Sequence, residues 1–341
     1  KKTYKGLSLL LPTSGSMGSP KFVKLTEDNL IQNAKSIISY LKINKKKRTV
    51  TTMPFSYSYM MSIINTYIET GATIYVTESS IIEKDFWEGF RKNKITCFSG
   101  VPYIFETLIK LGLEKIFTDS LEEFTQAGGK LNRESLNKLI NFCKKKDIKF
   151  KNMYGQTEAS PRISYLDWKY ISTKKGSIGK AIPGTKIMLK DNDGLKIKES
   201  KKEGEIVFEG KNVCLGYANC INDLNKPDEN KGVLHTGDIG YFDEDGFFYL
   251  SGRKNRIAKI FGNRINLDEL EEKLMNEGYR VASKYDGNKI SVFYEKNLSQ
   301  NELLKKITLI SGQNKNGFQL IRIDKLPITN SGKIEYSKLK K

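Results

Sequence analysis

Hydrophobic and polar positions alternate along the chain in a way that predicts strands separated by helices. Leu7–Leu11 is a short apolar run, which predicts a buried strand that ends in a loop rich in Gly and Ser. Thr26 then suits the N-cap of a helix. The apolar positions that would share one face of this helix are Leu30, Ala34, Ile37, Ile38 and Leu41.

Further apolar runs continue this alternation as far as Tyr154. They predict strands at Thr49–Thr52, Thr73–Val76, Ile95–Phe98, Phe124–Gln126 and Phe150–Tyr154, with helices such as Ile81–Arg91 and Arg133–Lys144 between them. Strands that alternate with helices are typical of parallel sheets with helices packed on their faces. We therefore expect an α/β fold for this region.

The pattern changes after about Ser177, where Gly, Asp and Asn turns separate short strands. The strand candidates are Lys186–Lys190, Gly204–Phe208 and Gly246–Leu250. They predict a small β-rich subdomain over about residues 177–253. This subdomain would be the last part of a large α/β domain that spans residues 1–253.

Beyond Arg253 the pattern changes again. Asn266 and Glu269 form a capping pair for a helix that carries Leu267, Leu270 and Leu274. Strands near Arg280–Tyr285, Lys289–Tyr294 and Leu320–Ile323, with a helix from about Gln300 to Leu309, complete a compact α+β unit. We expect a small C-terminal domain over residues 254–341, joined by a short hinge near Asn255.

The composition argues against a membrane span and against nucleic-acid binding. No stretch approaches the roughly 18 consecutive apolar residues that a membrane span requires. A net charge of +19 suits phosphate contacts, but only nine of the 58 basic residues are arginine, the residue that makes bidentate base contacts. Basic runs such as Lys144–Lys146 also lack interleaved aromatic residues for base stacking. Lysine-rich solvated faces are the favoured interpretation.

The cysteines and the histidine do not form a metal-ligand pattern. Cys97, Cys143, Cys214 and Cys220 include no CxxC pair, and His235 is the single histidine. Cys214 and Cys220 have a spacing that allows proximity, but a small buried thiol is the favoured interpretation for each. A reduced, cytoplasmic setting fits this usage.

The stretch Thr13–Lys21, directly after the first predicted strand, has a composition that suits phosphate binding. Its glycines let backbone N–H groups approach an anion, its hydroxyls add donors, and Lys21 adds a positive charge. It is not a nucleotide-binding P-loop, because GxxxxGK[ST] is absent. Taken alone, such a loop is more often a surface turn.

Three other stretches offer chemistry. Tyr154–Glu158, at the carboxyl end of a predicted strand, supplies an aromatic face for a base, a hydroxyl for a phosphate and a carboxylate for Mg²⁺. Thr236–Asp238 places a carboxylate on a tight turn, where it suits vicinal ribose hydroxyls. Pro327–Lys333 places a lysine on a turn-rich loop. The plain alternatives are a solvated strand end, an Asx-type turn and an idle solvated lysine.

The order and spacing of these stretches resemble the adenylate-forming superfamily of acyl-CoA synthetases, acyl ligases and peptide-synthetase adenylation domains. The phosphate loop resembles Thr13–Lys21, and the aromatic–Gly–x–Thr–Glu motif resembles Tyr154–Glu158. The remaining matches are Gly204-Glu205 through Gly216-Tyr217, Thr236–Asp238, Gly252-Arg253, then Lys259, Gly262, Arg264, Glu269 and Glu271, and finally Pro327, Thr329, Gly332 and Lys333. The resemblance covers nearly the whole chain.

The resemblance implies that a substrate carboxylate attacks the α-phosphate of ATP, which gives an acyl-AMP and pyrophosphate. The residues it assigns to the β- and γ-phosphates are Thr13, Ser14, Gly15, Ser16, Gly18 and Lys21. It places Gly128 and Gly129 along the adenine, Tyr154 and Gly155 at the base, and Asp238 and Arg253 at the ribose. It assigns Thr157 to the α-phosphate, Glu158 to Mg²⁺, and Lys333 to the carboxylate and α-phosphate as the catalytic lysine.

The resemblance also implies partners and a movement. The small C-terminal domain would swing after adenylation, so that the thiol of CoA or of a carrier protein's phosphopantetheine attacks. The hinge holds Asn255, where the family usually has Asp or Lys. Ser56 occupies the place of a histidine or of the aspartate that holds an α-amine, which counts against an α-amino acid. Tyr57, Tyr59 and Met60 line either the acyl pocket or the core.

The chain begins just ahead of the phosphate loop and without Met, which predicts a fragment, a processed form or a shortened natural form. A non-catalytic adenylate-binding relative or an inactive fragment is therefore one alternative to an adenylate-forming ligase. A basic nucleic-acid-binding protein is the other, and the less favoured.

Overall fold

The computed structural model describes residues 3–13, 21–116, 118–295, 299–328 and 334–340. A 12-stranded sheet forms its centre, in the order β11-β10-β12-β14-β15-β9-β8-β7-β6-β5-β3-β4. The parallel part consists of β3 (Arg48–Val50), β4 (Thr73–Tyr75), β5 (Cys97–Gly100), β6 (Glu123–Gln126) and β7 (Lys149–Gly155). Each of these strands overlaps a run predicted from the sequence, and the predicted fold class is confirmed here.

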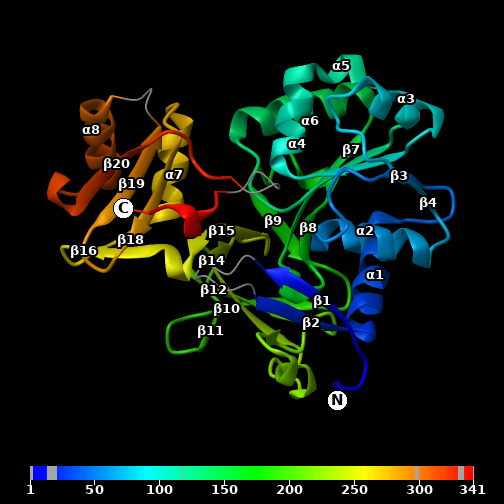
Figure 1. The fold of residues 1–341 in the computed structure, drawn as a ribbon, viewed down its shortest axis with the longest axis horizontal. Helices are drawn as coiled ribbons and strands as arrows, with labels where there is room; N and C mark the ends of the chain where they lie inside the picture. The colour runs from blue at the N-terminus through cyan, green and yellow to red at the C-terminus, as the bar shows by residue number, and fades with distance from the viewer. Residues whose placement is uncertain (1–2, 14–20, 117, 296–298, 329–333, 341) are drawn as a thin grey trace.

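Helices cover both faces of the parallel part (Figure 1). α1 (Glu27–Leu41) and α2 (Ser58–Glu69) lie on one face. α3 (Lys84–Lys92), α4 (Pro102–Leu111), α5 (Leu113–Ile116) and α6 (Arg133–Lys146) lie toward the other. Thr26 caps α1 as predicted: its Oγ1 accepts from the Asn29 backbone N–H, and the Asn29 side chain accepts in return.

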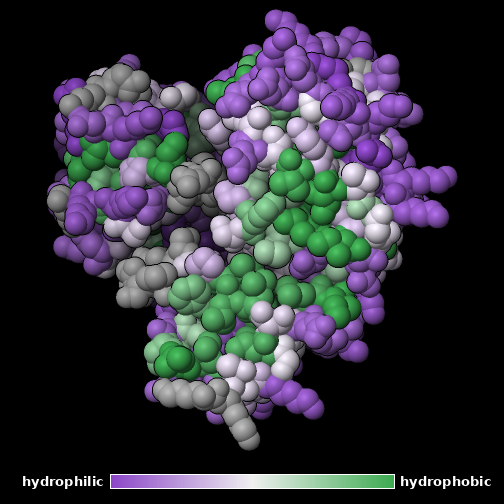
Figure 2. Space-filling model, turned by 45° about the vertical axis from the view of Figure 1, so that its right-hand side comes forward, coloured by the Kyte–Doolittle hydropathy of each residue, from purple (hydrophilic) through white to green (hydrophobic). Residues whose placement is uncertain are grey.

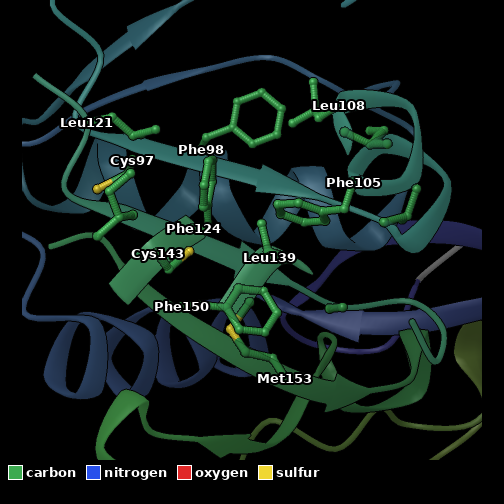
Figure 3. Packing of buried hydrophobic residues seen from close by; sticks show 14 of the residues in the cluster. Cys97, Phe98, Phe105, Leu108, Leu121, Phe124, Leu139, Cys143, Phe150 and Met153 are labelled. Atoms are coloured by element: carbon green, nitrogen blue, oxygen red, sulfur yellow. The ribbon is translucent and has the colours of Figure 1, made fainter. Parts of the chain in front are cut away.

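An aromatic core fills the space between the sheet and α4 and α6 (Figure 3). Phe98, Phe124 and Phe150 come from β5, β6 and β7, and Phe105 comes from α4. Their rings contact edge to face, with centroids 5.5 to 6.0 Å apart. Because burying a phenylalanine contributes about 1.5–3 kcal/mol, this cluster is a main source of stability for the sheet.

The first strand departs from the prediction. β1 (Leu7–Thr13) pairs antiparallel with β2 (Lys21–Thr26), and β13 (Tyr217–Ala218) completes a separate three-stranded sheet. Of the β1 residues only Leu11 is buried. The expectation of a buried strand within the parallel layer was therefore wrong, because the chain reverses directly into β2 instead of crossing through a helix.

Antiparallel strands extend the central sheet beyond β7. They are β8 (Arg162–Leu166), β9 (Ser177–Ala181), β10 (Lys186–Lys190), β11 (Lys196–Ile197), β12 (Gly204–Glu209), β14 (Val233–Phe242) and β15 (Phe248–Arg253). The β-rich texture predicted after Ser177 is present, and β10 has the predicted bounds. Single 3₁₀ turns occur at η1 (Thr157–Ala159), η2 (Trp168–Tyr170), η3 (Ile221–Asn225), η4 (Lys254–Arg256), η5 (Lys315–Gly317) and η6 (Tyr336–Lys338).

Residues 257–339 build hydrophobic clusters of their own, beside the central sheet (Figure 1). The elements are β16 (Ile257–Ile260), β17 (Asn263–Asn266), α7 (Leu267–Asn276), β18 (Val281–Tyr285), β19 (Ile290–Glu295), α8 (Gln300–Ser311) and β20 (Phe318–Ile323). Asn266 caps α7 as predicted, because its Oδ1 accepts from the backbone N–H groups of Asp268 and Glu269. The Lys130–Glu272 ion pair, at 2.6 Å, joins this region to the large one.

The surface of the described residues is mixed in character. Figure 2 shows apolar surface gathered over part of one face, with hydrophilic residues around it. Exposed apolar side chains include Phe22 on β2, Ile68 on α2 and Val76 after β4. Within the described part of the chain, no helix combines the length and the apolar character that a membrane crossing needs.

Candidate functional site

A buried carboxylate joins three of the sequence-predicted residues at the carboxyl end of β7. Asp238 on β14 is 4% exposed and accepts a hydrogen bond from the Tyr154 hydroxyl. Gln156 donates to the same oxygen over 2.8 Å, and Arg253 Nε donates to the other oxygen over 2.9 Å. The structure therefore brings Tyr154, Asp238 and Arg253 into one cluster.

The strand pairing explains this meeting. Asp238 and Arg253 are register partners across β14 and β15, so their side chains share one face. Gly237, just before Asp238, has φ +70°, a left-handed conformation that favours glycine. The Thr236 hydroxyl accepts from the Asp238 backbone N–H over 3.1 Å. The tight turn predicted for Thr236–Asp238 is instead an irregularity within β14, where the pairing with β12 shifts register. Burial and the Asp238 charge hold the pKa of the Tyr154 hydroxyl well above its usual value, so it stays a donor.

Thr157 and Glu158 lie on η1, the turn that follows β7. The Thr157 hydroxyl oxygen is 3.1 Å from Ser58 Oγ at the start of α2. Glu158 Oε1 accepts from the Tyr217 hydroxyl over 2.7 Å, and Lys21 Nζ lies 5.7 Å from the centroid of the Tyr217 ring. The last residue of the predicted phosphate loop thus lies near the predicted magnesium ligand.

Glycine at position 155 is required by packing. A Cβ on Gly155 would lie 1.8 Å from the Pro161 carbonyl oxygen and 3.1 Å from the Arg162 Cα. Any other residue would therefore push β8 away from β7. This close approach sets the path of η1 and hence the positions of Thr157 and Glu158.

Gly128 and Gly129 form a second wall close to α2. Gly128 has φ +86°, and a Cβ there would lie 2.5 Å from the Tyr57 hydroxyl oxygen. Gln126 Nε2 donates to the Gly129 carbonyl over 2.8 Å and fixes the loop. Small residues here keep a flat backbone surface that a planar ring could contact.

The donor set fits a magnesium ion held chiefly by phosphates. Among the described residues, no group of three or more His, Cys, Asp or Glu side chains converges on one point. Glu158 and Lys21 both contact Tyr217, so Glu158 offers a carboxylate near Lys21. Mg²⁺ commonly takes one or two carboxylates, with substrate phosphates and waters completing its octahedron. One glutamate therefore suits a phosphate-bridged ion and would not suit an all-protein site.

Some predicted residues lie outside the described residues. These are Ser14, Gly15, Ser16 and Gly18 of the phosphate loop, and Lys333 of the tail. The described ends of both segments are paired: Thr13 Oγ1 donates to the Lys21 carbonyl over 3.2 Å, and Ile328 forms a bridge with Ile334.

Three residues of the cluster had no predicted role. Gln156 and Tyr217 lie inside the quoted motifs, whereas Ser58 lies one residue beyond Tyr57. In the sequence, only their nearness to motif residues could have pointed to these three residues, because polar residues in turns are usually exposed to solvent.

The thiols require one correction. Cys97, Cys143 and Cys214 are buried, as favoured for small thiols, but Cys220 is exposed. Cys220 is the N-cap of η3, a surface turn without an apolar face to bury it.

Comparison with known proteins gives consistent likenesses. A family model described as AMP-binding enzyme matches residues 5–218. The chain is 28% identical over 278 residues to a 2-succinylbenzoate–CoA ligase from Geobacillus sp. (strain WCH70), covering 80% of this chain and 54% of the ligase. It is 28% identical over 279 residues to luciferin 4-monooxygenase from Luciola mingrelica, covering 81% and 50%. The chain thus spans about half the length of these curated relatives.

Solved structures show the same fold over almost the whole chain. One is o-succinylbenzoate CoA synthetase from Bacillus subtilis in complex with its acyl-adenylate intermediate, with a TM-score of 0.82 and 25% identity over 97% of this chain and 68% of that chain. Another is the same synthetase with ATP and magnesium ion, with a TM-score of 0.81 and 25% identity over 97% and 69%. These likenesses confirm the predicted fold class of an α/β large region followed by a small α+β one.

Proposed function

Because the chain belongs to the AMP-binding enzyme family, we propose that it uses ATP to activate a carboxylic acid as an acyl-adenylate, with release of pyrophosphate. Transfer of the acyl group to a thiol completes the reaction. The observation that supports this most is the cluster of Tyr154, Asp238 and Arg253 beside Thr157 and Glu158. This cluster offers an aromatic ring for the base, a carboxylate for the ribose and a hydroxyl for the α-phosphate of an adenosine phosphate.

Nucleoside binding would use the buried carboxylate and the flat loop. Asp238 accepts hydrogen bonds from the ribose hydroxyls, and Arg253 beside it contributes a further donor. The adenine ring lies against Tyr154, Gly155 and the Gly128–Gly129 backbone. Tyr154 and Gln156 hold the Asp238 carboxylate in place before ATP binds, so little ordering is needed on binding.

Phosphate binding would use the loop between β1 and β2. Thr13 is the last residue of β1, and Lys21 is the first residue of β2. The loop residues between them would supply backbone N–H groups and hydroxyls to the β- and γ-phosphates. Thr157 donates to the α-phosphate. Glu158 would hold Mg²⁺, which supplies charge neutralisation for the phosphates.

The chemical step needs alignment more than covalent participation. A carboxylate oxygen of the acid bonds to the α-phosphorus, and the bond from that phosphorus to the bridging oxygen of the β-phosphate breaks, so pyrophosphate leaves. Lys333 stabilises the charge shared by the two anions. A thiol would then bond to the acyl carbon, and AMP would leave with the former carboxylate oxygen.

The acceptor and the movement belong to the same proposal. Residues 254–341 would form a mobile domain that turns near Asn255 after adenylation and admits CoA or a carrier protein's phosphopantetheine. The substrate is a small-molecule acid, and Ser56 offers no carboxylate for the amine of an amino acid. The four free thiols suit a reducing compartment such as the cytoplasm.

The test is carboxylate-dependent exchange of labelled pyrophosphate into ATP, with pools of fatty, aryl, hydroxy and amino acids. We expect exchange with one pool, lost in Lys333→Ala and kept in Lys325→Ala, an exposed lysine of the same segment. Retained ATP binding without exchange from any pool would favour a non-catalytic relative. Salt-dependent RNA binding unaffected by ATP would favour a nucleic-acid-binding protein instead.

A further inference from the structure

Three polar side chains from distant parts of the sequence meet inside the region of residues 254–341. They are Arg256 on η4, Glu271 on α7 and Tyr336 on η6. One oxygen of the Glu271 carboxylate accepts from Arg256 Nη2 over 2.6 Å, and the other accepts from the Tyr336 hydroxyl over 2.6 Å. Arg256 Nη2 also lies 3.1 Å from the Tyr336 hydroxyl oxygen, and its guanidinium carbon lies 4.1 Å from the centroid of the Tyr336 ring. Each of the three side chains therefore contacts the other two.

This cluster is largely buried. Glu271 is 7% exposed, and the side chain of Arg256 is 12% exposed. Burial raises the pKa of the Glu271 carboxyl, and the Arg256 charge opposes the rise. Burial and the Glu271 charge raise the pKa of the Tyr336 hydroxyl, so the hydroxyl stays a donor.

Stability alone is a poor explanation for this cluster. Removing two charges from water costs free energy that offsets most of their attraction, so a buried ion pair adds little net stability over an apolar packing. Hydrogen bonds between planar groups do fix the geometry of the groups that they join. A role in fixing geometry is therefore the better explanation.

The three residues connect the two points of this region that the proposed reaction uses. Arg256 directly follows Asn255, the proposed hinge residue, and Tyr336 is the third residue after Lys333, the proposed catalytic lysine. Glu271 holds Arg256 with one oxygen and Tyr336 with the other. The first residue after the hinge and the chain that follows Lys333 are thus tied to one carboxylate on α7.

Arg256 is also fixed to the body of the region. Its Nε donates to Asp268 on α7 over 2.7 Å, and its Nη1 donates to the Ser283 carbonyl on β18. The Ser283 backbone N–H in turn donates to the Glu271 carboxylate. A movement about the hinge would therefore carry Arg256, α7 and β18 together.

The chain enters and leaves the loop of Lys333 at a closed base. Ile328 and Ile334 form an antiparallel bridge on either side of this loop. Tyr336 lies two residues beyond the bridge, and Leu339, which is 4% exposed, belongs to an apolar cluster behind it. Because apolar contacts are non-directional, the hydrogen bonds of Tyr336 are the contacts that can set the position of this base.

We infer that Tyr336, held by Glu271 and Arg256, is a positioning residue for adenylation, because its hydroxyl fixes the base of the loop that carries Lys333. This inference rests on the proposed function and adds three residues to its machinery. Lys333 acts while the carboxylate attacks the α-phosphorus, so the cluster serves that half of the reaction. The later attack of a thiol on the finished adenylate should not need the Tyr336 hydroxyl.

The test separates the two halves of the reaction in Tyr336→Phe, which removes one hydroxyl and keeps the ring. With the acid that supports pyrophosphate exchange, we expect the kcat of exchange to fall roughly 10- to 100-fold, because a misplacement of about 1 Å can cost that much. The KM values for ATP and for the acid should stay within about twofold. Acyl transfer from the synthetic acyl-adenylate of that acid to CoA or pantetheine should keep its wild-type rate.

Two further variants frame this result. Lys333→Ala should show the same separation, with exchange lost and acyl transfer kept. Tyr285→Phe is the matched control, because its hydroxyl donates to the Gly287 carbonyl over 2.8 Å at the end of β18. This variant loses a tyrosine hydrogen bond in the same region and should keep both halves of the reaction.

Hydrogen exchange gives a readout that needs no substrate. The backbone amides of residues 334–340 should exchange faster in Tyr336→Phe than in wild type, whereas those of α7 and β18 to β20 should keep their protection. Equal exchange of residues 334–340 in the two proteins would show that the hydroxyl does not hold this segment, and would overturn the inference.

The kinetic outcomes distinguish this inference from the proposed function. An active wild type with an unchanged kcat in Tyr336→Phe would overturn the inference and leave the proposed function intact. Equal loss of exchange and of acyl transfer, or loss of protection across α7, would show a purely structural tyrosine and would also overturn it. A wild type that neither exchanges pyrophosphate with any acid nor transfers an acyl group would contradict the proposed function, and this role of Tyr336 with it.

Discussion

At the scale of single residues, the proposed nucleotide site depends on Asp238. Its carboxylate is buried, and three donors from two segments, the end of β7 and the end of β15, converge on it. Burying a carboxylate costs free energy unless hydrogen-bond donors match it, and these three donors do so. In the proposed site, the ribose hydroxyls would compete with part of this set.

The first prediction concerns Asp238→Asn. The amide keeps the shape but loses the charge and presents an N–H group toward other donors. We expect the KM for ATP to rise roughly 10- to 100-fold, since a charge-assisted hydrogen bond contributes about 1.5–3 kcal/mol. Asp245→Asn, at an exposed carboxylate paired with Lys174, is the matched control and should leave the KM for ATP unchanged. An unchanged KM in Asp238→Asn would remove Asp238 from the nucleotide site.

The sequence predicted the residues of this cluster better than their supporting contacts. Tyr154, Asp238 and Arg253 were named because they lie in motifs with a fixed order. Gln156 was missed, because a lone glutamine at a turn is normally taken as solvated. Its hydrogen bond to Asp238 joins the end of β7 to β14, which is a long-range property of the fold.

At the scale of elements, the approach of β7 and β8 sets the position of η1. Gly155 is the contact point, where a side chain has no space. The prediction is that Gly155→Ala lowers the free energy of unfolding by more than about 3 kcal/mol, because the added methyl group overlaps backbone atoms that cannot rotate away. Gly71→Ala, where nothing lies within 4 Å and φ is +64°, should cost only about 1 kcal/mol for the left-handed backbone. Denaturant unfolding of both variants compares them, and equal losses would contradict the packing argument.

The buried ion pair between β6 and β7 gives a pH prediction. Burial raises the pKa of the Glu123 carboxyl, and Lys151 opposes the rise. In Lys151→Met this opposition is lost, so the folded-state pKa lies further above the unfolded one. The stability that the protonated Glu123 contributes is then fully present below the unfolded pKa and is lost as the pH rises through the folded pKa.

We therefore expect Lys151→Met to cost about 3 kcal/mol at pH 8 and clearly less at pH 5. The double variant Lys151→Met/Glu123→Met should recover most of the loss. Lys138→Met breaks an exposed pair with Glu134 and should change stability little at either pH. A loss in Lys151→Met that does not depend on pH would show that Glu123 is not the group left without a partner.

The sequence predicted elements well where local signals and tertiary context agree. The strands β5, β6 and β7 and the caps of α1 and α7 follow from apolar runs and from Thr26 and Asn266. β1 was misplaced because an apolar run does not state whether the next connection is a helix or a hairpin. The choice was made by β2, whose Val23 pairs with Leu11.

At the scale of the whole molecule, the burial of the thiols reports global folding. Burial raises the pKa of Cys214 to about 12 and raises the pKa values of Cys97 and Cys143, so their thiolate forms are scarce at pH 8. We expect iodoacetamide to label Cys220 alone in the folded protein and all four cysteines in urea. Peptide mass spectrometry reads the sites, and labelling of Cys214 as fast as Cys220 would contradict the described packing around β13.

The division into two regions was predicted from the change in the pattern of strands, helices and turns beyond Arg253. That residues 254–341 move as a body stays a prediction. Residues 257–339 form separate hydrophobic clusters, and the Lys130–Glu272 pair and the Asn266 side chain on the Ser251 carbonyl contact the large region. The Lys130–Glu272 pair is exposed, and exposed ion pairs are weak, which suits a hinge. The contacts between the two regions could not be predicted from the motifs, because each motif is local in the sequence.

The measurement that tests the central claim most directly follows one oxygen atom. The acid that supports exchange is prepared with ¹⁸O in its carboxylate and incubated with the protein, ATP, magnesium and hydroxylamine, which captures the acyl group. Attack of the carboxylate on the α-phosphorus predicts AMP that carries one ¹⁸O, in an amount equal to the acyl hydroxamate. AMP without ¹⁸O, or ADP as the nucleotide product, would contradict adenylate formation at this site.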